Sequence, residues 1–202
     1  MDPIEKATII RFHRSRIEDF GGGTTGALGL HRTESQTKRF DVLAQVGDFS
    51  GRVVLDVGCG YGDLKEYLDQ RFSGFLYFGI DQMPEFIPEA TERYKNCANT
   101  HFFQADFSAV KLPSIDYVLA SGALAYRSDD PDFHINIVRK MYDSAASALA
   151  FNMLDADRCP EHPLLRGHNL DEIVQRCQEL CPDVQVIQGY LDDDFTVFMR
   201  RD

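Results

Sequence analysis

The stretch of this chain best suited to bind a ligand is residues 53–64, VVLDVGCGYGDL, in which glycine occupies alternate positions of a turn: Gly58, Gly60 and Gly62. The turn follows an apolar run typical of a strand buried on both faces, and a helical pattern begins at Asp63. Glycine has no Cβ, so the backbone can approach a ligand closely, and a helix N-terminus adds free N–H groups. The segment predicts a nucleotide-type binding loop with bare backbone N–H groups facing the ligand.

The residues around this loop limit what it can bind. The dinucleotide motif requires glycine where the chain has Asp63, and the phosphate-binding P-loop requires a Gly-Lys-Ser/Thr sequence that the loop lacks. The loop contains no Lys or Arg, and the carboxylates of Asp56 and Asp63 would repel a pyrophosphate. It therefore suits a ligand with an adenosine and a cation rather than a polyphosphate.

The pattern acid-x-Gly-x-Gly-x-Gly is complete in this loop, with its positions at Asp56, Gly58, Gly60 and Gly62. In this motif the chain resembles the class I S-adenosylmethionine-dependent methyltransferases. Two further segments, SQTKRF at 35–40 and LDDDFTVFMRR at 191–201, resemble small bacterial methyltransferases without an assigned substrate. The resemblance covers most of the chain. It implies methyl transfer with S-adenosylmethionine as cofactor and S-adenosylhomocysteine as product.

Asp81 closes the second predicted strand, roughly twenty residues after the glycine loop. A carboxylate at this place can accept hydrogen bonds from both hydroxyls of a ribose. Its alternative role, an N-cap for the helix predicted over 84–94, is weaker because Pro84 marks that helix start by itself. We therefore expect Asp81, with Gln82 beside it, to belong to the cofactor site.

Two more pairs complete the expected site. The resemblance implies that Asp106 bonds the adenine amino group and that the Phe107 amide meets a ring nitrogen; an ordinary turn is the alternative. Ligands of open α/β sheets bind beyond the carboxyl ends of the strands at the switch point, which places Ser121 and Gly122 near the methyl group. The predicted cofactor-binding residues are Asp56, Gly58, Cys59, Gly60, Tyr61, Gly62, Asp63, Asp81, Gln82, Asp106, Phe107, Ser121 and Gly122.

Apolar strand patterns alternate with helical patterns, which predicts an α/β fold with a mostly parallel sheet. Strands are expected near 53–55, 74–81, 100–105, 115–120 and 148–154, and helices over 4–20, 35–47, 84–94, about 129–147 and 170–181. Two β-rich runs, 184–191 and 195–200, predict a terminal hairpin. By the resemblance, an antiparallel C-terminal strand distinguishes this three-layer, Rossmann-like methyltransferase sheet from dinucleotide-binding domains.

We expect one domain in two parts. Residues 1–49 form an N-terminal helical cap, and residues 50–202 form the S-adenosylmethionine-binding methyltransferase core. The glycine-rich stretch at 21–26 suits either a lid or a plain connector. The segment Arg11–Arg16 holds three arginines and a histidine, and we interpret it as a solvated helix face.

Composition excludes several classes of protein. The chain has 202 residues, of which 44% are hydrophobic and 26% charged, close to an average globular composition. A net charge of −11 makes nucleic acid a poor partner, and no apolar run is long enough for a membrane span. Five cysteines and the lack of a signal-peptide pattern favour the cytoplasm. The Cys-x-x-His at Cys159 and the pair Cys177 and Cys181 lack paired Cys-x-x-Cys knuckles, so no metal site is expected.

The methyl acceptor is expected to be a small molecule of apolar or aromatic character, met by four aromatic residues: Phe12, Phe20, Tyr126 and Phe133. No catalytic residue can be named, because a base is needed only when the acceptor carries a proton. His162 and His168 lie in a loop on the carboxyl side of the sheet and either suits a substrate-side base, but surface histidines are more common there, so neither is assigned a role. Arg39 suits either the carboxylate of the cofactor or the surface.

Other functions stay open at this point. A non-catalytic member of the fold that binds cofactor or a partner protein fits a site with no clear catalytic group. A NAD-dependent oxidoreductase is disfavoured by Asp63 and by the terminal hairpin. A polyamine synthase would need an N-terminal β-domain, for which there is no room.

Overall fold

One twisted sheet organises the chain, and its strands run in the order β3-β2-β1-β4-β5-β8-β7, with the short β6 beside β5. The computed structural model describes residues 1–29 and 33–201. The strands are β1 (Val53–Val57), β2 (Leu76–Asp81), β3 (Thr100–Gln104), β4 (Ile115–Ala120), β5 (Ala145–Asp155), β6 (Gly167–His168), β7 (Asp183–Gln188) and β8 (Asp194–Arg200). The helices are α1 (Pro3–Phe20), α2 (Thr33–Leu43), α3 (Asp63–Asp69), α4 (Phe86–Arg93), α5 (Phe133–Ser144) and α6 (Leu170–Gln178), with a 3-10 turn at Ala44–Val46.

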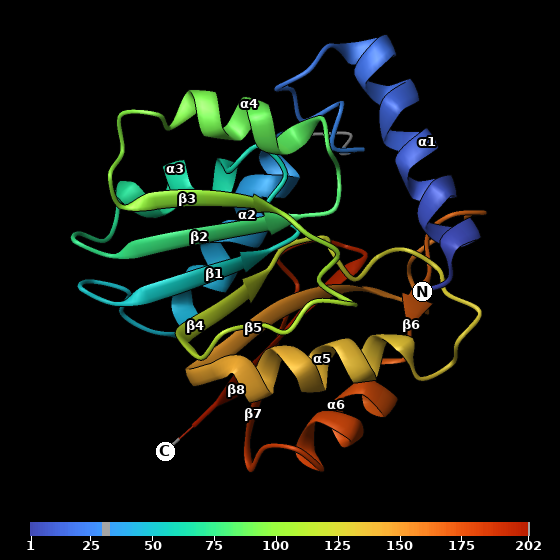
Figure 1. The fold of residues 1–202 in the computed structure, drawn as a ribbon. Helices are drawn as coiled ribbons and strands as arrows, with labels where there is room; N and C mark the ends of the chain where they lie inside the picture. The colour runs from blue at the N-terminus through green and yellow to red at the C-terminus, as the bar shows by residue number, and fades with distance from the viewer. Residues whose placement is uncertain (30–32, 202) are drawn as a thin grey trace.

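Helices cover both faces of the sheet and give three layers (Figure 1). Successive residues of a strand point to opposite faces. Leu55 of β1 therefore joins the core under α5 and α6, while Val54 joins the core under α2 and α3. Because β1 and β4 are buried on both sides, apolar residues predominate along each strand without strict alternation, and each strand holds one aspartate, Asp56 or Asp116.

The terminal hairpin forms as predicted. Strand β8 runs antiparallel to β5, with Ala148 opposite Arg200, and β7 runs antiparallel to β8. Gly189, at φ +82°, turns the chain after β7. All other described neighbours in the sheet are parallel. The fold class predicted from the sequence is confirmed.

Several element boundaries differ from prediction. The helix expected from Pro84 begins at Phe86, because Pro84 and Glu85 form a turn that precedes it. The fifth strand begins at Ala145 rather than 148, since the chain leaves α5 directly into extended backbone at that residue. Helix α6 ends at Gln178.

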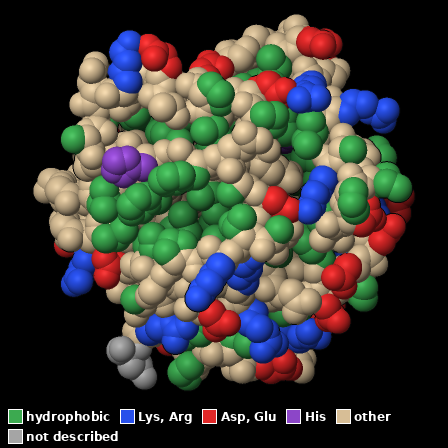
Figure 2. Space-filling view, viewed as in Figure 1, with side chains coloured by type: hydrophobic (Ala, Val, Ile, Leu, Met, Phe, Trp, Pro, Cys, Tyr) green, Lys and Arg blue, Asp and Glu red, His purple; other side chains and the backbone are tan. Residues whose placement is uncertain are grey.

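One face of the sheet carries no helix over β2 and β3 (Figure 1). Residues 105–114, all of them described, connect β3 to β4 in loops and turns alone. The rings of Phe78, His101 and Phe103 therefore stack on an open surface, and Phe103 is 51% exposed. Figure 2 shows an apolar area at the left, where Figure 1 places β2 and β3.

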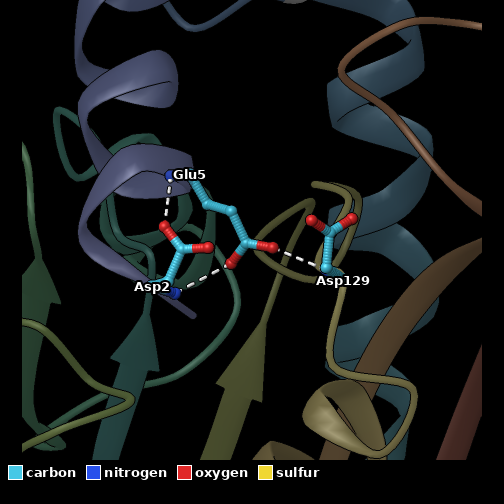
Figure 3. A group of neighbouring side chains, drawn as sticks. All are labelled: Asp2, Glu5 and Asp129. Carbon is cyan, nitrogen blue, oxygen red and sulfur yellow. Dashed lines mark hydrogen bonds between the residues drawn. The ribbon is translucent and has the colours of Figure 1, made fainter.

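Helix α1 lies across the carboxyl ends of the strands (Figure 1). Its start is a capping box, in which Asp2 accepts from the Glu5 N–H and Glu5 accepts from the Asp2 N–H. Glu5 also accepts from the Ser128 hydroxyl and the Asp129 N–H, so the same carboxylate ties α1 to the loop after β4 (Figure 3). A small separate core, which includes Ala27 and Phe86, holds the rest of the helix.

Candidate functional site

A cavity is lined by residues at the carboxyl ends of β1, β2 and β4 and by residues of α1. It collects nearly all the predicted cofactor-binding residues: Asp56, Gly58, Cys59, Gly60, Asp63, Asp81, Gln82, Asp106, Phe107, Ser121 and Gly122. Residues from the first 49 also line it, among them Ile9 and His13 of α1. The wall therefore combines the sheet edge with the N-terminal helices.

Tyr61 and Gly62, also predicted, lie outside this cavity. The Tyr61 ring is buried against Phe86, with ring centroids 4.7 Å apart. Gly62 has φ +80°, and its carbonyl accepts from the Tyr94 hydroxyl at 2.7 Å. Through these contacts both residues stabilise the conformation of the glycine loop without lining the cavity.

The glycine loop differs from the expectation of bare N–H groups. The N–H of Gly58 donates to Ile80 O at 2.8 Å, and the N–H of Gly60 donates to Asp81 Oδ2 at 3.0 Å. Gly58 has φ +77°, and a Cβ on it would lie 2.6 Å from the Ala123 Cβ. Glycine is thus required by conformation and by close packing. The N–H groups of Gly58 and Gly60 are therefore already used within the protein.

Asp56 is the most unusual of these carboxylates. Its Oδ2 accepts from the Tyr77 hydroxyl at 2.6 Å, while its Oδ1 is buried without a hydrogen-bond partner among the described residues. Burial raises the pKa of Asp56 to about 7, against the lowering effect of the Tyr77 bond and with help from the charges of Asp81 and Asp63. A buried acceptor of this kind is costly unless a ligand supplies a donor or a cation.

Asp81 stands at the tip of β2. It accepts from the N–H of Gly60 at 3.0 Å and of Met83 at 2.9 Å, one bond to each carboxylate oxygen. Burial raises its pKa in spite of these bonds. Because α4 begins at Phe86, Asp81 is not its N-cap. Each oxygen keeps a lone pair for a ligand hydroxyl.

Two other acids are already paired. Asp63 accepts from Arg93 at 2.6 Å and from the Gln36 amide at 3.1 Å, so a cation from the protein compensates its charge. Asp106 accepts from the backbone and hydroxyl of Ser108 and pairs with Lys6 of α1. The Asp106 carboxylate therefore stabilises an ordinary turn after β3, which was the alternative to adenine binding.

Hydrogen bonds to β5 and β8 fix the loop after β4. The Gly122 N–H donates to Asn152 Oδ1 at 2.9 Å, and Asn152 donates to Asp194 at 3.3 Å. Arg39 pairs with Asp194 through two hydrogen bonds, and its side chain is only 12% exposed. Arg39 is thus not a surface arginine, and its charge already has a buried partner at the cavity edge.

The histidines differ most from expectation. His162 accepts from two backbone N–H groups of its own loop, and His168 is buried beside His134, with ring centroids 4.4 Å apart. His168 is therefore not a surface histidine, and both histidines lie outside the cavity. His13, interpreted as part of a solvated face, is buried and lines the cavity. Its spacing from Ile9 and Ile17, four residues each way on one helix face, was the signal that could have shown this.

The expected acceptor residues separate into two groups. Tyr126 and Phe133 line the cavity. Phe12 packs on His13, and Phe20 is 50% exposed beneath the Arg16 guanidinium, so neither reaches the cavity. Two of the four aromatic residues expected to contact the methyl acceptor therefore line the cavity.

Metal-binding residue types gather at one place in the described chain, the acidic group of Asp2, Glu5 and Asp129 (Figure 3). Two of these three side chains are exposed, and Glu5 is committed to the hydrogen bonds that anchor α1. The group is a tether between α1 and the loop after β4.

Comparison with known proteins agrees with this geometry. Residues 54–148 match the family model described as a methyltransferase domain. A trans-aconitate 2-methyltransferase of Escherichia coli is 29% identical over 142 residues, which are 69% of this chain and 54% of that protein. Residues 54–148 are thus similar to a methyltransferase domain, and these matches support a class I S-adenosylmethionine-dependent methyltransferase.

Two further relatives extend the comparison. This chain is 35% identical over 105 residues to the protein named "Putative methyltransferase Rv1506c" of Mycobacterium tuberculosis. The match covers 49% of this chain and 61% of that protein. The chain thus spans between 54% and 61% of the length of these two curated relatives. It shares its fold with magnesium protoporphyrin IX methyltransferase of Synechocystis PCC 6803, at TM-score 0.70 and 18% identity over 100% of this chain and 98% of the other.

Within residues 1–29 and 33–201, no helix is both long enough and apolar enough to cross a bilayer.

Proposed function

We propose that this protein transfers the methyl group of S-adenosylmethionine to a small-molecule acceptor. The observation that carries the proposal is Asp56 Oδ1, buried beside Asp81 and without a partner among the described residues. Among the described residues neither Asp56 nor Asp81 forms an ion pair, and two buried acids without one are unfavourable alone. A ligand that brings an ammonium group and two ribose hydroxyls satisfies both of them, and S-adenosylmethionine has these groups.

Each carboxylate has its own part in this proposal. Asp56 takes the ammonium group, and Asp81 takes the ribose hydroxyls through its two remaining lone pairs. Asp106 and Phe107 meet the adenine, once the carboxylate is released from Lys6. The cofactor supplies an electrophilic methyl group, so the protein has mainly to align the acceptor with it and exclude water.

The acceptor follows from the cavity walls. Tyr126, Phe133 and Ile9 of α1 all line the cavity, an apolar and partly aromatic surround that suits a small molecule. We also infer that residues 1–49 act as a cap on a core of residues 50–202, since α1 supplies part of the cavity wall. The net charge of −11 disfavours nucleic acid. All five cysteines are free thiols, which suits a cytoplasmic protein.

Calorimetric titration of the purified protein tests the proposal. S-Adenosylmethionine and S-adenosylhomocysteine should bind, and NADH should not. Asp81→Ala should weaken binding by about 1.5–3 kcal/mol, or about one to two orders of magnitude, because it removes two hydrogen bonds to a buried carboxylate. His101→Ala, on the open sheet face, is the matched control and should bind as the wild type does.

Binding of NADH in place of the sulfur ligands would refute the proposal, as would binding of none of the three. Tight cofactor binding without transfer of a labelled methyl group to any component of a cell extract would favour the non-catalytic alternative instead.

A further inference from the structure

His13 and Tyr126 form a pair on the wall of the cavity. The Tyr126 hydroxyl lies 2.5 Å from His13 Nε2, and the two rings meet edge to face with centroids 5.8 Å apart. His13 comes from α1 and is 5% exposed, whereas Tyr126 is half-buried and follows β4. Both residues line the cavity that holds Asp56 and Asp81.

The second ring nitrogen of His13 fixes which way the hydrogen bond runs. Nδ1 lies 3.0 Å from the Ala27 carbonyl oxygen, which can only accept, so Nδ1 carries the proton. In a neutral imidazole the other nitrogen is then an acceptor. Tyr126 therefore donates its hydroxyl proton to Nε2, and one lone pair on the tyrosine oxygen is left to accept from a ligand.

The surroundings keep the imidazole neutral. Burial lowers the pKa of His13, and the Arg16 charge acts in the same direction, while the Ala27 carbonyl and Glu85 oppose it. Burial raises the pKa of Tyr126, and the Asp81 charge adds to this effect. Near neutral pH the pair is thus a protonated tyrosine bonded to an unprotonated nitrogen.

We propose that Tyr126 and His13 together accept the proton of the methyl acceptor, and that the reacting group of the acceptor is a hydroxyl. This inference rests on the proposed function and adds to it the class of the acceptor.

The step balances without any further reactant. The acceptor oxygen forms a bond to the methyl carbon, and the carbon–sulfur bond breaks with its electron pair left on sulfur. The acceptor proton moves to the Tyr126 oxygen as the Tyr126 proton moves to His13 Nε2. The positive charge that leaves sulfur ends on the imidazolium, whose Nδ1–H is still held by the Ala27 carbonyl.

Hydroxyl fits this place better than the other common acceptor groups. A carboxylate has no proton to give to the pair. An ammonium group would have to lose its water shell against apolar side chains that line the same cavity: Ile9, Phe86 and Phe133. A neutral hydroxyl enters at lower cost and uses the free lone pair of Tyr126.

A matched panel of acceptors tests the class of acceptor. The protein is incubated with methyl-labelled S-adenosylmethionine and either 4-methylphenol, 4-methylbenzoate or 4-methylaniline, which present a hydroxyl, a carboxylate and an amine on the same ring. Label is expected on the phenol alone. Binding of S-adenosylhomocysteine is measured in parallel, so that failure of the proposed function is seen as a loss of that binding.

Three substitutions test the pair itself. Tyr126→Phe removes the hydroxyl, His13→Gln replaces the base with an amide that cannot take a proton, and His13→Asn keeps a donor toward Ala27. Each should reduce transfer to the phenol by about 10²- to 10⁴-fold at neutral pH. Transfer by the variants should recover as pH rises and the phenol ionises in solution, because a phenolate needs no base. A merely structural role would give a loss that is equal at every pH.

His101→Asn makes the same chemical change outside the cavity and should leave the rate unchanged. Variants that still bind S-adenosylhomocysteine as the wild type does are folded, so their rates can be interpreted. Label on the benzoate or the aniline, label on none of the three, or losses that do not depend on pH would overturn the inference, provided that the wild type binds S-adenosylhomocysteine.

Discussion

The Tyr77 hydroxyl on β2 donates to Asp56 Oδ2 on β1 at 2.6 Å, and both side chains are enclosed by the sheet and its helices. The bond favours the ionised carboxylate, but burial has the larger effect, and the pKa of Asp56 rises to about 7. The ligand-free protein near neutral pH therefore holds a partly protonated Asp56. A bound ammonium group would shift it to the ionised form.

The first prediction concerns stability against pH. The pKa of Asp56 is raised from 3.8 to about 7 on folding, so its protonated form is favoured in the folded state. Its contribution to stability is fully present below the unfolded pKa and is lost as pH rises through the folded pKa. Between pH 5 and pH 8 the loss should be about 2–3 kcal/mol.

Urea unfolding at pH 5 and pH 8 checks this contribution. Asp56→Asn keeps an acceptor for Tyr77 and cannot ionise, so it should gain stability relative to the wild type as pH rises. Equal differences between the two proteins at both pH values would contradict the assigned pKa.

The second prediction concerns the buried ion pair of Arg39 and Asp194. The Asp194 side chain has no exposed surface, so Arg39→Met leaves an uncompensated buried charge. The free energy of unfolding should fall by about 3–5 kcal/mol. The double variant Arg39→Met, Asp194→Asn should be less destabilised than Arg39→Met alone. Chemical denaturation measures both, and a double variant that is the less stable of the two would show that the pair acts in another way.

The third prediction concerns Gly58. Gly58 has φ +77°, and the Cβ that alanine would add there lies 2.6 Å from the Ala123 Cβ. Gly58→Ala should therefore lower the free energy of unfolding by about 2–5 kcal/mol. Gly189→Ala is the matched control, since Gly189 has a similar φ of +82° but open space around it. Its cost should be about 1–2 kcal/mol. Thermal unfolding would compare them, and equal costs would mean that the Ala123 contact adjusts freely.

The fourth prediction concerns Lys6, whose ion pair with Asp106 occupies the carboxylate expected to meet adenine. Both partners are partly exposed, so breaking the pair should cost less than about 1 kcal/mol. Lys6→Met should therefore leave stability nearly unchanged and tighten S-adenosylhomocysteine binding up to about fivefold. Lys38→Met removes a comparable exposed pair with Glu34 and should not affect binding. Weaker binding in Lys6→Met alone would show that Lys6 itself helps to hold the ligand.

The features that could be predicted from the sequence are those set by residues close together in the chain. The glycine spacing, Asp81 after a strand and the terminal hairpin depend on residues close in the chain, and the cavity at the strand ends follows from the rule for open sheets. The partners of the charged groups could not be predicted in this way. Asp63, Asp106 and Arg39 find their partners 30, 100 and 155 residues away, in contacts that exist only once the helices have docked.

The cavity is lined by two parts of the chain, one that precedes the residues matching the family model and one within them. The acids that would bind the cofactor are Asp56, Asp81 and Asp106, which lie on or just after strands and within the residues 54–148 that match the family model. His13 precedes that region. Tyr126 lies inside the matched region but on a loop, where sequence change is well tolerated. A lineage could therefore exchange its first helix and remodel one loop, and so acquire a new acceptor, while the machinery for the shared cofactor stays as it was.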